Sequence, residues 1–381
     1  MSSTNLRQTV LATAKHVVVK VGTQLLTQPR ATRPGVDTAY IARLTKQIAS
    51  LHQSGYHITL VSSGAIGCGC AELGLKSRPT DVAQQQAVAA VGQRRLINHM
   101  HDAFAKHGLG VGQVLLTRSD FDDRVRFLNI RNCVTKLHDM GCVPVLNEND
   151  TVAVDEIRFG DNDLLAALTC NALRADALIL LTVVDGLLDA SGKVIDQVDN
   201  VLDHIGRLRR DNPAQNQWGS GGIQSKLEAA RLVTEAGEIA VIASGRESNV
   251  LTKILEANPV GTVFAPAHRK LDARQRWIGL TARPAGTLSV DQGAASALLG
   301  RGKSLLASGI HEITGRFNRG DILTIRDHQG REIARGLSNY SADELRLIMG
   351  KRSSQFEKIL GRPAYSEVIH RNHLVTLNVA R

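Results

Sequence analysis

Two clusters of Asn, Asp and Glu residues lie close together in the stretch NENDTVAVDEIRFGDND, residues 147–163. The first cluster, residues 147–150, directly follows an apolar run at residues 142–146 that is typical of a buried strand. Its side chains would therefore emerge at the carboxyl end of a strand, where open α/β sheets bind their ligands. Asn, Asp and Gly also form turns for local reasons, so two solvated turns explain either cluster alone equally well.

Two lysines occur where a phosphate group can bind. Lys20 lies near the end of a β-branched run, residues 16–21, and a lysine in such a strand must reach solvent, form an ion pair or serve a ligand. Lys226 follows the glycine-rich residues 219–222 in the first turn of an expected helix, where a cation is disfavoured unless an anion also binds. Because Ser225 precedes this lysine, the loop is not a Walker A loop. We interpret it as a different phosphate loop.

A third stretch of small residues, SSGAIGCG at residues 62–69, follows an expected strand at residues 58–62. Small residues let backbone N–H groups approach a ligand closely, and a helix start behind them favours an anion. A tight strand-to-helix turn explains the same pattern equally well.

Composition excludes several classes of protein. The 381 residues are enough for two or three domains, and the chain contains neither an apolar stretch of 18 residues nor an N-terminal segment like a signal peptide. The five cysteines are scattered and odd in number, which argues against a disulfide framework. We therefore expect a cytoplasmic protein with no membrane association. From residue 271 onward, 17 Lys and Arg residues face 10 Asp and Glu residues, a net charge of +7 that favours phosphate-bearing partners.

Strands and helices alternate along the first 270 residues. Strands are expected at residues 16–21, 58–62, 112–116, 142–146, 177–182, 239–243 and 261–264, and helices at residues 36–54, 82–107, 125–140, 164–173, 223–237 and 250–256. This alternation predicts an α/β fold whose mainly parallel sheet is sandwiched by helices. We interpret residues 1–270 as one domain, residues 271–285 as a linker, and residues 286–381 as a small β-rich barrel domain.

Taken together, the motifs resemble those of the amino acid kinase superfamily. The motifs are KVGT at residues 20–23, SSGAI at residues 62–66, NEND at residues 147–150, GDND at residues 160–163, and GSGG at residues 219–222 before Lys226. More narrowly, the whole chain is similar to the glutamate 5-kinase family, and its last part resembles a PUA domain. This resemblance implies transfer of the γ-phosphoryl group of ATP, accompanied by Mg²⁺, to the side-chain carboxylate of L-glutamate. The products would be L-glutamyl 5-phosphate and ADP, at the first step of proline biosynthesis.

The resemblance also assigns roles to individual residues. Lys20, Lys226 and Asp150 are expected to be the catalytic residues, and the two lysines are expected to contact the phosphates. Ser63, Asp150 and Asn162 match glutamate-binding positions, and we add that Asp150 can orient a lysine, whereas Asn147 and Asp163 help to shape the pocket. The nucleotide is expected to contact Lys20, Thr182, Val183, Ser220, Gly221, Gly222, Ile223, Gln224, Ser225 and Lys226.

One position departs from the family pattern. Many relatives have Thr-Asp where this chain has Thr182-Val183, so either backbone groups make the nucleotide contact or Asp185 replaces the missing acid. The resemblance further implies a homo-oligomer that is inhibited by proline at or beside the glutamate pocket, with Asp120 and Glu156 at positions linked to that response. No protein ligand of the metal can be named.

Two alternatives stay open. One is a kinase for a related acid, N-acetylglutamate or aspartate, against which the PUA-like tail and the two acidic motifs argue. The other is an RNA-binding protein acting through the basic C-terminal domain, and this alternative leaves Lys20, Lys226 and residues 147–163 without a role. Because aromatic residues are few in this domain, a stacking platform for single strands is not evident, and a regulatory or assembly role is favoured.

Overall fold

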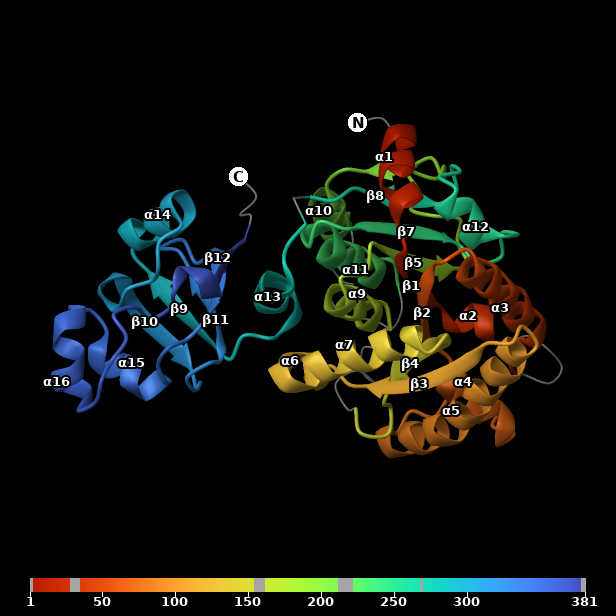
Figure 1. The fold of residues 1–381 in the computed structure, drawn as a ribbon, viewed down its shortest axis with the longest axis horizontal. Helices are drawn as coiled ribbons and strands as arrows, with labels where there is room; N and C mark the ends of the chain where they lie inside the picture. The colour runs from red at the N-terminus through yellow and green to blue at the C-terminus, as the bar shows by residue number, and fades with distance from the viewer. Residues whose placement is uncertain (1–2, 28–34, 154–161, 212–221, 268–269, 378–381) are drawn as a thin grey trace. The chain divides into compact units, whose positions relative to one another are not determined.

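The computed structural model describes residues 3–27, 35–153, 162–211, 222–267 and 270–377. The chain forms two compact units, Met1–Lys270 and Leu271–Arg381. Each unit has its own sheet and its own hydrophobic core (Figure 1). Within the described ranges, no helix has both the length and the apolar character needed to span a membrane.

An 8-stranded sheet forms the centre of the first unit, in the order β3-β4-β2-β1-β5-β7-β8-β6 among the described residues. The strands are β1 (His16–Val21), β2 (His57–Ser62), β3 (Gly110–Leu116), β4 (Cys142–Glu148), β5 (Ala177–Thr182), β6 (Gln197–Val198), β7 (Ile239–Ser244) and β8 (Thr262–Phe264). Neighbouring strands pair in parallel except β7 and β8, which are antiparallel. The mainly parallel sheet predicted from the sequence is therefore confirmed.

Helices cover both faces of this sheet (Figure 1). The helices α3 (Thr38–Gln53), α5 (Val82–Ala105) and α12 (Val250–Leu255) contribute to one core with alternate residues of β1, namely Val17, Val19 and Val21. The helices α7 (Arg124–Asp139), α9 (Asn162–Leu173) and α11 (Ile223–Glu235) contact the sheet strands from the other side. Because side chains alternate between faces along a strand, Lys20 points to the side covered by α9.

Shorter elements complete the first unit. They are α1 (Ser3–Val10), α2 (Thr23–Leu26), α4 (Ala65–Glu72), α6 (Ser119–Asp122), α10 (Val201–Asp211) and the 3₁₀ turn Leu11–Thr13. The sequence predicted a ligand loop or tight turn at residues 62–69, and the structure has Gly64 at φ +101° followed directly by α4. Most of the segment between the two acidic clusters, residues 154–161, lies outside the described residues.

The second unit contains a 5-stranded mixed sheet in the order β10-β9-β11-β12-β13 within the described part of the chain. Its elements are α13 (Ala273–Arg276), the π-helical turn Trp277–Thr281, β9 (Gly286–Val290), α14 (Gln292–Arg301), β10 (Ile310–Gly315), β11 (Ile322–Arg326), β12 (Glu332–Leu337), α15 (Ala342–Ile348), α16 (Phe356–Leu360) and β13 (Leu374–Thr376), with 3₁₀ turns at Ala307–Gly309, Ser353–Gln355 and Arg371–His373. The predicted small β-rich domain is confirmed.

Residues 271–285, which the sequence suggested to be a linker, fold as part of this second unit. Trp277 and Ile278 are buried, and the π-helical turn packs on β12 and β13. Arg276 is fully buried as well, and its Nε donates a hydrogen bond to Leu271 O at 2.9 Å. The charged composition suggested a linker, but Arg276 and its apolar neighbours are buried in the core of this unit.

Close packing of α4 on α5 depends on two glycines. A Cβ atom on Gly92 would stand 1.9 Å from Ala65 O and 2.3 Å from Gly69 N, and one on Gly69 would stand 1.9 Å from Val88 O. Real Cβ atoms essentially never lie closer than 3.0 Å to another heavy atom of this kind. Backbone therefore lies against backbone at this crossing, and α5 fixes the position of the first turn of α4.

We predict that Gly92→Ala destabilises the first unit by more than about 2 kcal/mol, because overpacking costs more than the roughly 1 kcal/mol that alanine gains in a helix. Urea unfolding followed by far-ultraviolet circular dichroism measures the loss. The matched control is Gly300→Ala in α14, where a Cβ meets nothing within 4 Å. Equal stability of the two variants would contradict this packing.

Candidate active site

A cavity of about 370 Å³ lies at the carboxyl ends of β1, β2 and β4. This is the edge at which the sequence predicted a ligand site, and the volume suits a small molecule such as an amino acid. The lining residues are polar and small for the most part: Thr23, Gln24, Thr27, Ser63, Gly64, Ala65, Ile66, Gly67, Cys70, Arg78, Asn147, Glu148, Asp150 and Asn162.

Next to this cavity, Asp163 lies between two lysines. Lys20 Nζ is 2.5 Å from Asp163 Oδ1, and Lys226 Nζ is 3.0 Å from Asp163 Oδ2. All three side chains are buried. Burial by itself would raise the pKa of Asp163, but the charges of Lys20 and Lys226 and their hydrogen bonds hold that pKa below its usual range. Within the described part of the chain, this group of two ammonium ions and one carboxylate carries a net positive charge, which attracts phosphate.

Three elements bring these residues together. Lys20 comes from β1, Asp163 from the first turn of α9, and Lys226 from the first turn of α11. Ser225 adds a further contact, because its hydroxyl donates to Asp163 Oδ2 at 3.1 Å. The predicted pair of phosphate-directed lysines is thus juxtaposed by tertiary packing of α9 and α11 on the sheet.

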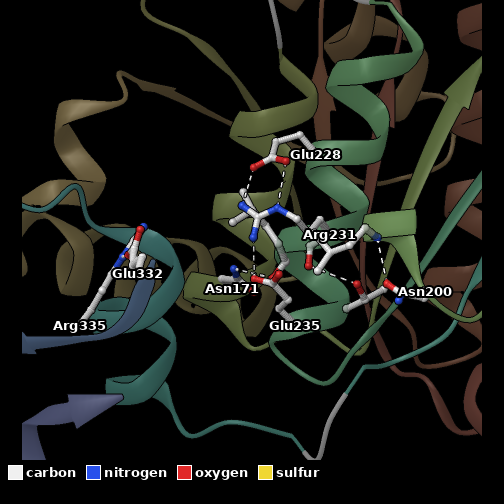
Figure 2. A network of polar contacts seen from close by, with 10 residues as sticks. Asn171, Asn200, Glu228, Arg231, Glu235, Glu332 and Arg335 are labelled. Atoms are coloured by element: carbon white, nitrogen blue, oxygen red, sulfur yellow. Dashed lines mark hydrogen bonds and ion pairs between the residues drawn. The ribbon is translucent and has the colours of Figure 1, made fainter. Parts of the chain in front are cut away.

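The packing of α9 on α11 is held by polar contacts (Figure 2). Asn171 Nδ2 donates to Leu232 O at 3.4 Å, which ties the two helices together. On α11, Arg231 lies between Glu228 and Glu235, with Nε 2.9 Å from Glu228 Oε2 and Nη1 2.7 Å from Glu235 Oε2. These contacts brace the helix that carries Lys226.

A network of buried amides underlies the cavity. Asn162 Nδ2 lies 2.7 Å from Ser62 O, 2.8 Å from Asn147 Oδ1 and 3.1 Å from Ser63 Oγ. Asn147 Nδ2 in turn donates to Gln93 Oε1 on α5 at 2.6 Å. Asn162 Oδ1 is buried and has no hydrogen-bond partner within the described ranges. Because Asn162 also lines the cavity, this oxygen is available to accept a hydrogen bond from a ligand.

Asp150 occupies a different environment from Asp163. It lines the cavity, and burial raises its pKa to about 6, although the positive charge of Arg78 acts in the opposite direction. The sequence suggests that Asp150 orients a lysine, but in the structure it is Asp163 that contacts the two lysines. The difference is positional, because Asp150 lies in the turn after β4, whereas Asp163 belongs to α9.

Thr182 and Val183, expected to contact the nucleotide, lie at the carboxyl end of β5. Thr182 O accepts a hydrogen bond from Gly245 N at 2.8 Å, and Val183 packs partly buried against the core. Asp185 lines a second cavity of about 480 Å³, together with Ser244 at the end of β7. Asp185, rather than Val183, therefore presents a carboxylate at this edge.

The expected glycine loop is described only at its end. Ser220 and Gly221 lie outside the described residues. Gly222 is the N-cap of α11, and residues 223–226 form the first turn of that helix. Ile223, Gln224 and Ser225 thus stand beside Lys226, as the sequence suggested.

The structure offers no cluster of three His, Cys, Asp or Glu side chains suited to a metal ion in its described ranges. Both carboxylate oxygens of Asp163 face lysines, so this acid is already engaged. Of the acids suggested for proline sensing, Glu156 lies outside the described residues. Asp120 caps a local turn, accepting hydrogen bonds from Thr117 N at 2.7 Å and Arg126 Nη1 at 2.9 Å.

Some residues of the site escaped the sequence analysis. Arg78 lines the cavity, and Gln93 accepts a hydrogen bond from Asn147. Neither carries a local signature, because only tertiary packing brings each of them to the site. Asp163 was assigned only a shaping role, since nothing local shows that it meets lysines from β1 and α11. Its position directly after Asn162 in the GDND motif was the available signal.

Comparisons with known proteins agree with this architecture. A model of the amino acid kinase family matches residues 15–243, and a model of the PUA domain matches residues 286–360. Glutamate 5-kinase of Chromohalobacter salexigens is 45% identical over 372 residues, covering 96% of this chain and 97% of its own. Glutamate 5-kinase of Syntrophus aciditrophicus is 42% identical over 381 residues, covering 98% of this chain and 97% of its own.

Among solved structures, a carbamate kinase from Giardia covers 66% of this chain and 99% of its own, with 17% identity and a TM-score of 0.47. The family model covers more than half of the chain, and the curated relatives match it along nearly the full length. The chain therefore belongs to the amino acid kinase family, among the glutamate 5-kinases, and carries a PUA domain.

Proposed function

We propose that the protein transfers the γ-phosphoryl group of ATP to the side-chain carboxylate of L-glutamate, forming L-glutamyl 5-phosphate and ADP. The observation that carries this proposal is the positively charged Lys20, Asp163 and Lys226 cluster beside a cavity of amino-acid size. Asp163 and Asn162 are consecutive, so the phosphate-binding charges and the cavity meet at one turn of α9. The names of the full-length relatives support the same reaction.

The cavity provides the acceptor side of the reaction. Asp150 supplies a carboxylate for the ammonium group of glutamate, and Asn162 Oδ1 supplies a second acceptor. Ser63, whose hydroxyl lies 3.1 Å from Asn162 Nδ2, is placed to contact the same ligand. The reacting carboxylate of glutamate has an ordinary pKa near 4.3, so it is already ionised at neutral pH and needs no general base.

The two lysines provide the donor side. Phosphoryl transfer depends on alignment and on neutralising the charge of the transferring group. Lys226, at the first turn of α11, is placed to stabilise that charge, while Lys20 holds the phosphates from β1. Asp163 keeps the two ammonium groups at fixed positions without cancelling their combined charge. The first turn of α11 and the glycine loop before it complete the proposed nucleotide site.

Mg²⁺ is proposed to accompany ATP. The described side chains offer no cluster that would hold it by themselves, and Asp163 is engaged by lysines. Mg²⁺ commonly keeps several water ligands and binds through substrate phosphates, which fits a site whose protein groups are mainly cationic.

Further proposals extend from the family. Proline, which carries a carboxylate and an ammonium group as glutamate does, is proposed to bind at or beside the same cavity as a feedback inhibitor of proline biosynthesis. The five free cysteines fit the reducing cytoplasm. A homo-oligomer is proposed from family membership, and the basic PUA domain is proposed to act in regulation or assembly, with RNA as the alternative partner.

Turnover assays test the proposed reaction. We expect ADP release with ATP and Mg²⁺ to depend on L-glutamate, and hydroxylamine to trap an acyl phosphate product. Aspartate, N-acetylglutamate and RNA serve as competing candidates in parallel reactions. A folded sample that releases no ADP with glutamate would show the proposal to be wrong.

We predict that Lys226→Ala lowers kcat by roughly 100-fold or more, because an electrostatic contact to the transferring group is lost. The KM for glutamate should change little, since Lys226 does not line the acceptor cavity. Steady-state kinetics separates the two parameters. The control is Lys136→Ala, which removes an exposed lysine paired with Asp139 on the surface of α7. An unchanged kcat in Lys226→Ala would refute the assigned role.

We predict that the KM for glutamate rises as the pH falls through about 6, because protonated Asp150 no longer attracts an ammonium group. The same raised pKa means that the folded state binds a proton more readily than the unfolded state between about pH 4 and 6. Charged Asp150 therefore costs stability above this window. Asp150→Asn should raise the free energy of unfolding near pH 7.5 by about 1 to 3 kcal/mol while weakening glutamate binding.

Denaturation at a series of pH values checks the stability change, which should vanish below about pH 4. Asp102→Asn, at an exposed position of α5, is the matched control. Asp150→Asn with normal glutamate kinetics, or with lower stability than the parent near pH 7.5, would contradict this assignment.

A further inference from the structure

Arg78 is the one cation among the described residues that line the acceptor cavity. The lining also contains two acids, Glu148 and Asp150. The guanidinium of Arg78 makes no hydrogen bond or ion pair within the described ranges, and the residue is exposed. Elsewhere in the first unit, Arg126, Arg95 and Arg231 each pair with a carboxylate. Arg78 thus stands at the cavity with its donors uncommitted.

Arg78 and the two lysines act on different groups of the site. Its charge acts on Asp150 and on Cys70, near the end of α4, whereas the charges that act on Asp163 are those of Lys20 and Lys226. Positive charges therefore lie on two sides of the cavity, since the two lysines stand beside it toward α9 and Arg78 belongs to its lining after α4. Between Ala65 and Cys70, both in the lining, α4 rises about 7.5 Å, which is enough to span an extended amino dicarboxylate.

This arrangement matches the charges of the acceptor. Glutamate has two carboxylates and one ammonium group. The side-chain carboxylate must face the lysines to receive the phosphoryl group, and the ammonium suits Asp150. The remaining α-carboxylate would lie near the acids Glu148 and Asp150. Its negative charge would be repelled there unless a cation were also present. A guanidinium offers a planar fork that matches a carboxylate.

We propose that Arg78 binds the α-carboxylate of the acceptor amino acid and thereby selects acceptors that carry one. This inference rests on the proposed reaction and adds a specificity determinant to it. Arg78 does not touch the reacting atoms, so it sets affinity and selectivity and leaves the chemical step to the lysines.

A comparison of two ligands tests this role. L-glutamate and 4-aminobutyrate share the reacting carboxylate and the amine, but 4-aminobutyrate lacks the α-carboxylate. Arg78→Met should raise the KM for glutamate by roughly 10- to 100-fold, the range expected for loss of one charged hydrogen-bonding pair. The inhibition constant of 4-aminobutyrate, measured in competition with glutamate, should stay within about twofold of the parent value. The kcat should change by less than about threefold.

Two further variants sharpen the result. Arg78→Lys keeps the charge but loses the planar fork, so its KM for glutamate should fall between those of the parent and Arg78→Met. Lys76→Met removes an exposed cation from the same segment that does not line the cavity, and it should leave both ligands unaffected.

The outcomes separate this inference from the proposed reaction. Absence of glutamate turnover in the parent enzyme overturns the reaction itself. Where the parent turns over glutamate, an unchanged KM in Arg78→Met overturns the role of Arg78 alone. An equal loss of affinity for glutamate and 4-aminobutyrate also overturns it, since that result indicates a general distortion of the cavity.

Discussion

The active site depends on one carboxylate buried between two ammonium groups. An isolated charge in a protein interior costs several kcal/mol, so Lys20, Asp163 and Lys226 are stable there only as a group. Their contacts of 2.5 and 3.0 Å join β1, α9 and α11, which are far apart in the sequence. Among the described residues of this group, two positive charges share one negative charge. The fold thus holds a buried surplus of positive charge at the sheet edge, and a phosphate group is the natural counterion.

The first turn of α9 connects this surplus to the acceptor cavity. Consecutive helical residues point about 100° apart, so neighbouring side chains serve different surroundings. Asn162 is directed to the amide network and the cavity, while Asp163 is directed to the lysines. A shift of α9 would disturb both halves of the site together. The contacts that brace α9 and α11, such as Asn171 with Leu232 O, therefore serve alignment as well as stability.

Much of the first unit follows from local sequence patterns. The apolar run at residues 177–182 coincides with β5 (Ala177–Thr182), because a short β-branched and leucine-rich run bounded by turn residues has few other ways to be buried. Lys20 and Ser63 lie at the carboxyl ends of β1 and β2, because strand ends in a parallel sheet share one edge, and Asn162 lies within hydrogen-bond distance of Ser63. Local patterns thus predict well which residues lie at that edge of the sheet.

Patterns could not show which partners meet across the fold. The pairing of Asp163 with lysines from β1 and α11 is decided by helix packing, and so is the approach of Gln93 to Asn147. The small residues at 62–69 left a ligand loop and a tight turn equally open, and neither interpretation showed that Gly69 is required by the close approach of α5. The charged segment at residues 271–285 was interpreted as a linker, although Arg276 and Trp277 are buried in the second unit. In each case the sequence suggested the commonest role of that residue type, whereas tertiary contacts determine a different role.

Charge varies systematically along the sheet edge, and this variation restricts how ATP can bind. The acceptor cavity contains Glu148 and Asp150, the centre contains the surplus positive charge, and the second cavity contains Asp185 and Glu247. A triphosphate is repelled by both acidic ends and attracted to the centre. On the proposed function, the uncharged nucleoside is the part that can extend toward Asp185, whose carboxylate can accept hydrogen bonds from hydroxyl groups. Val183 then needs to supply only backbone groups, because its side chain packs against the core.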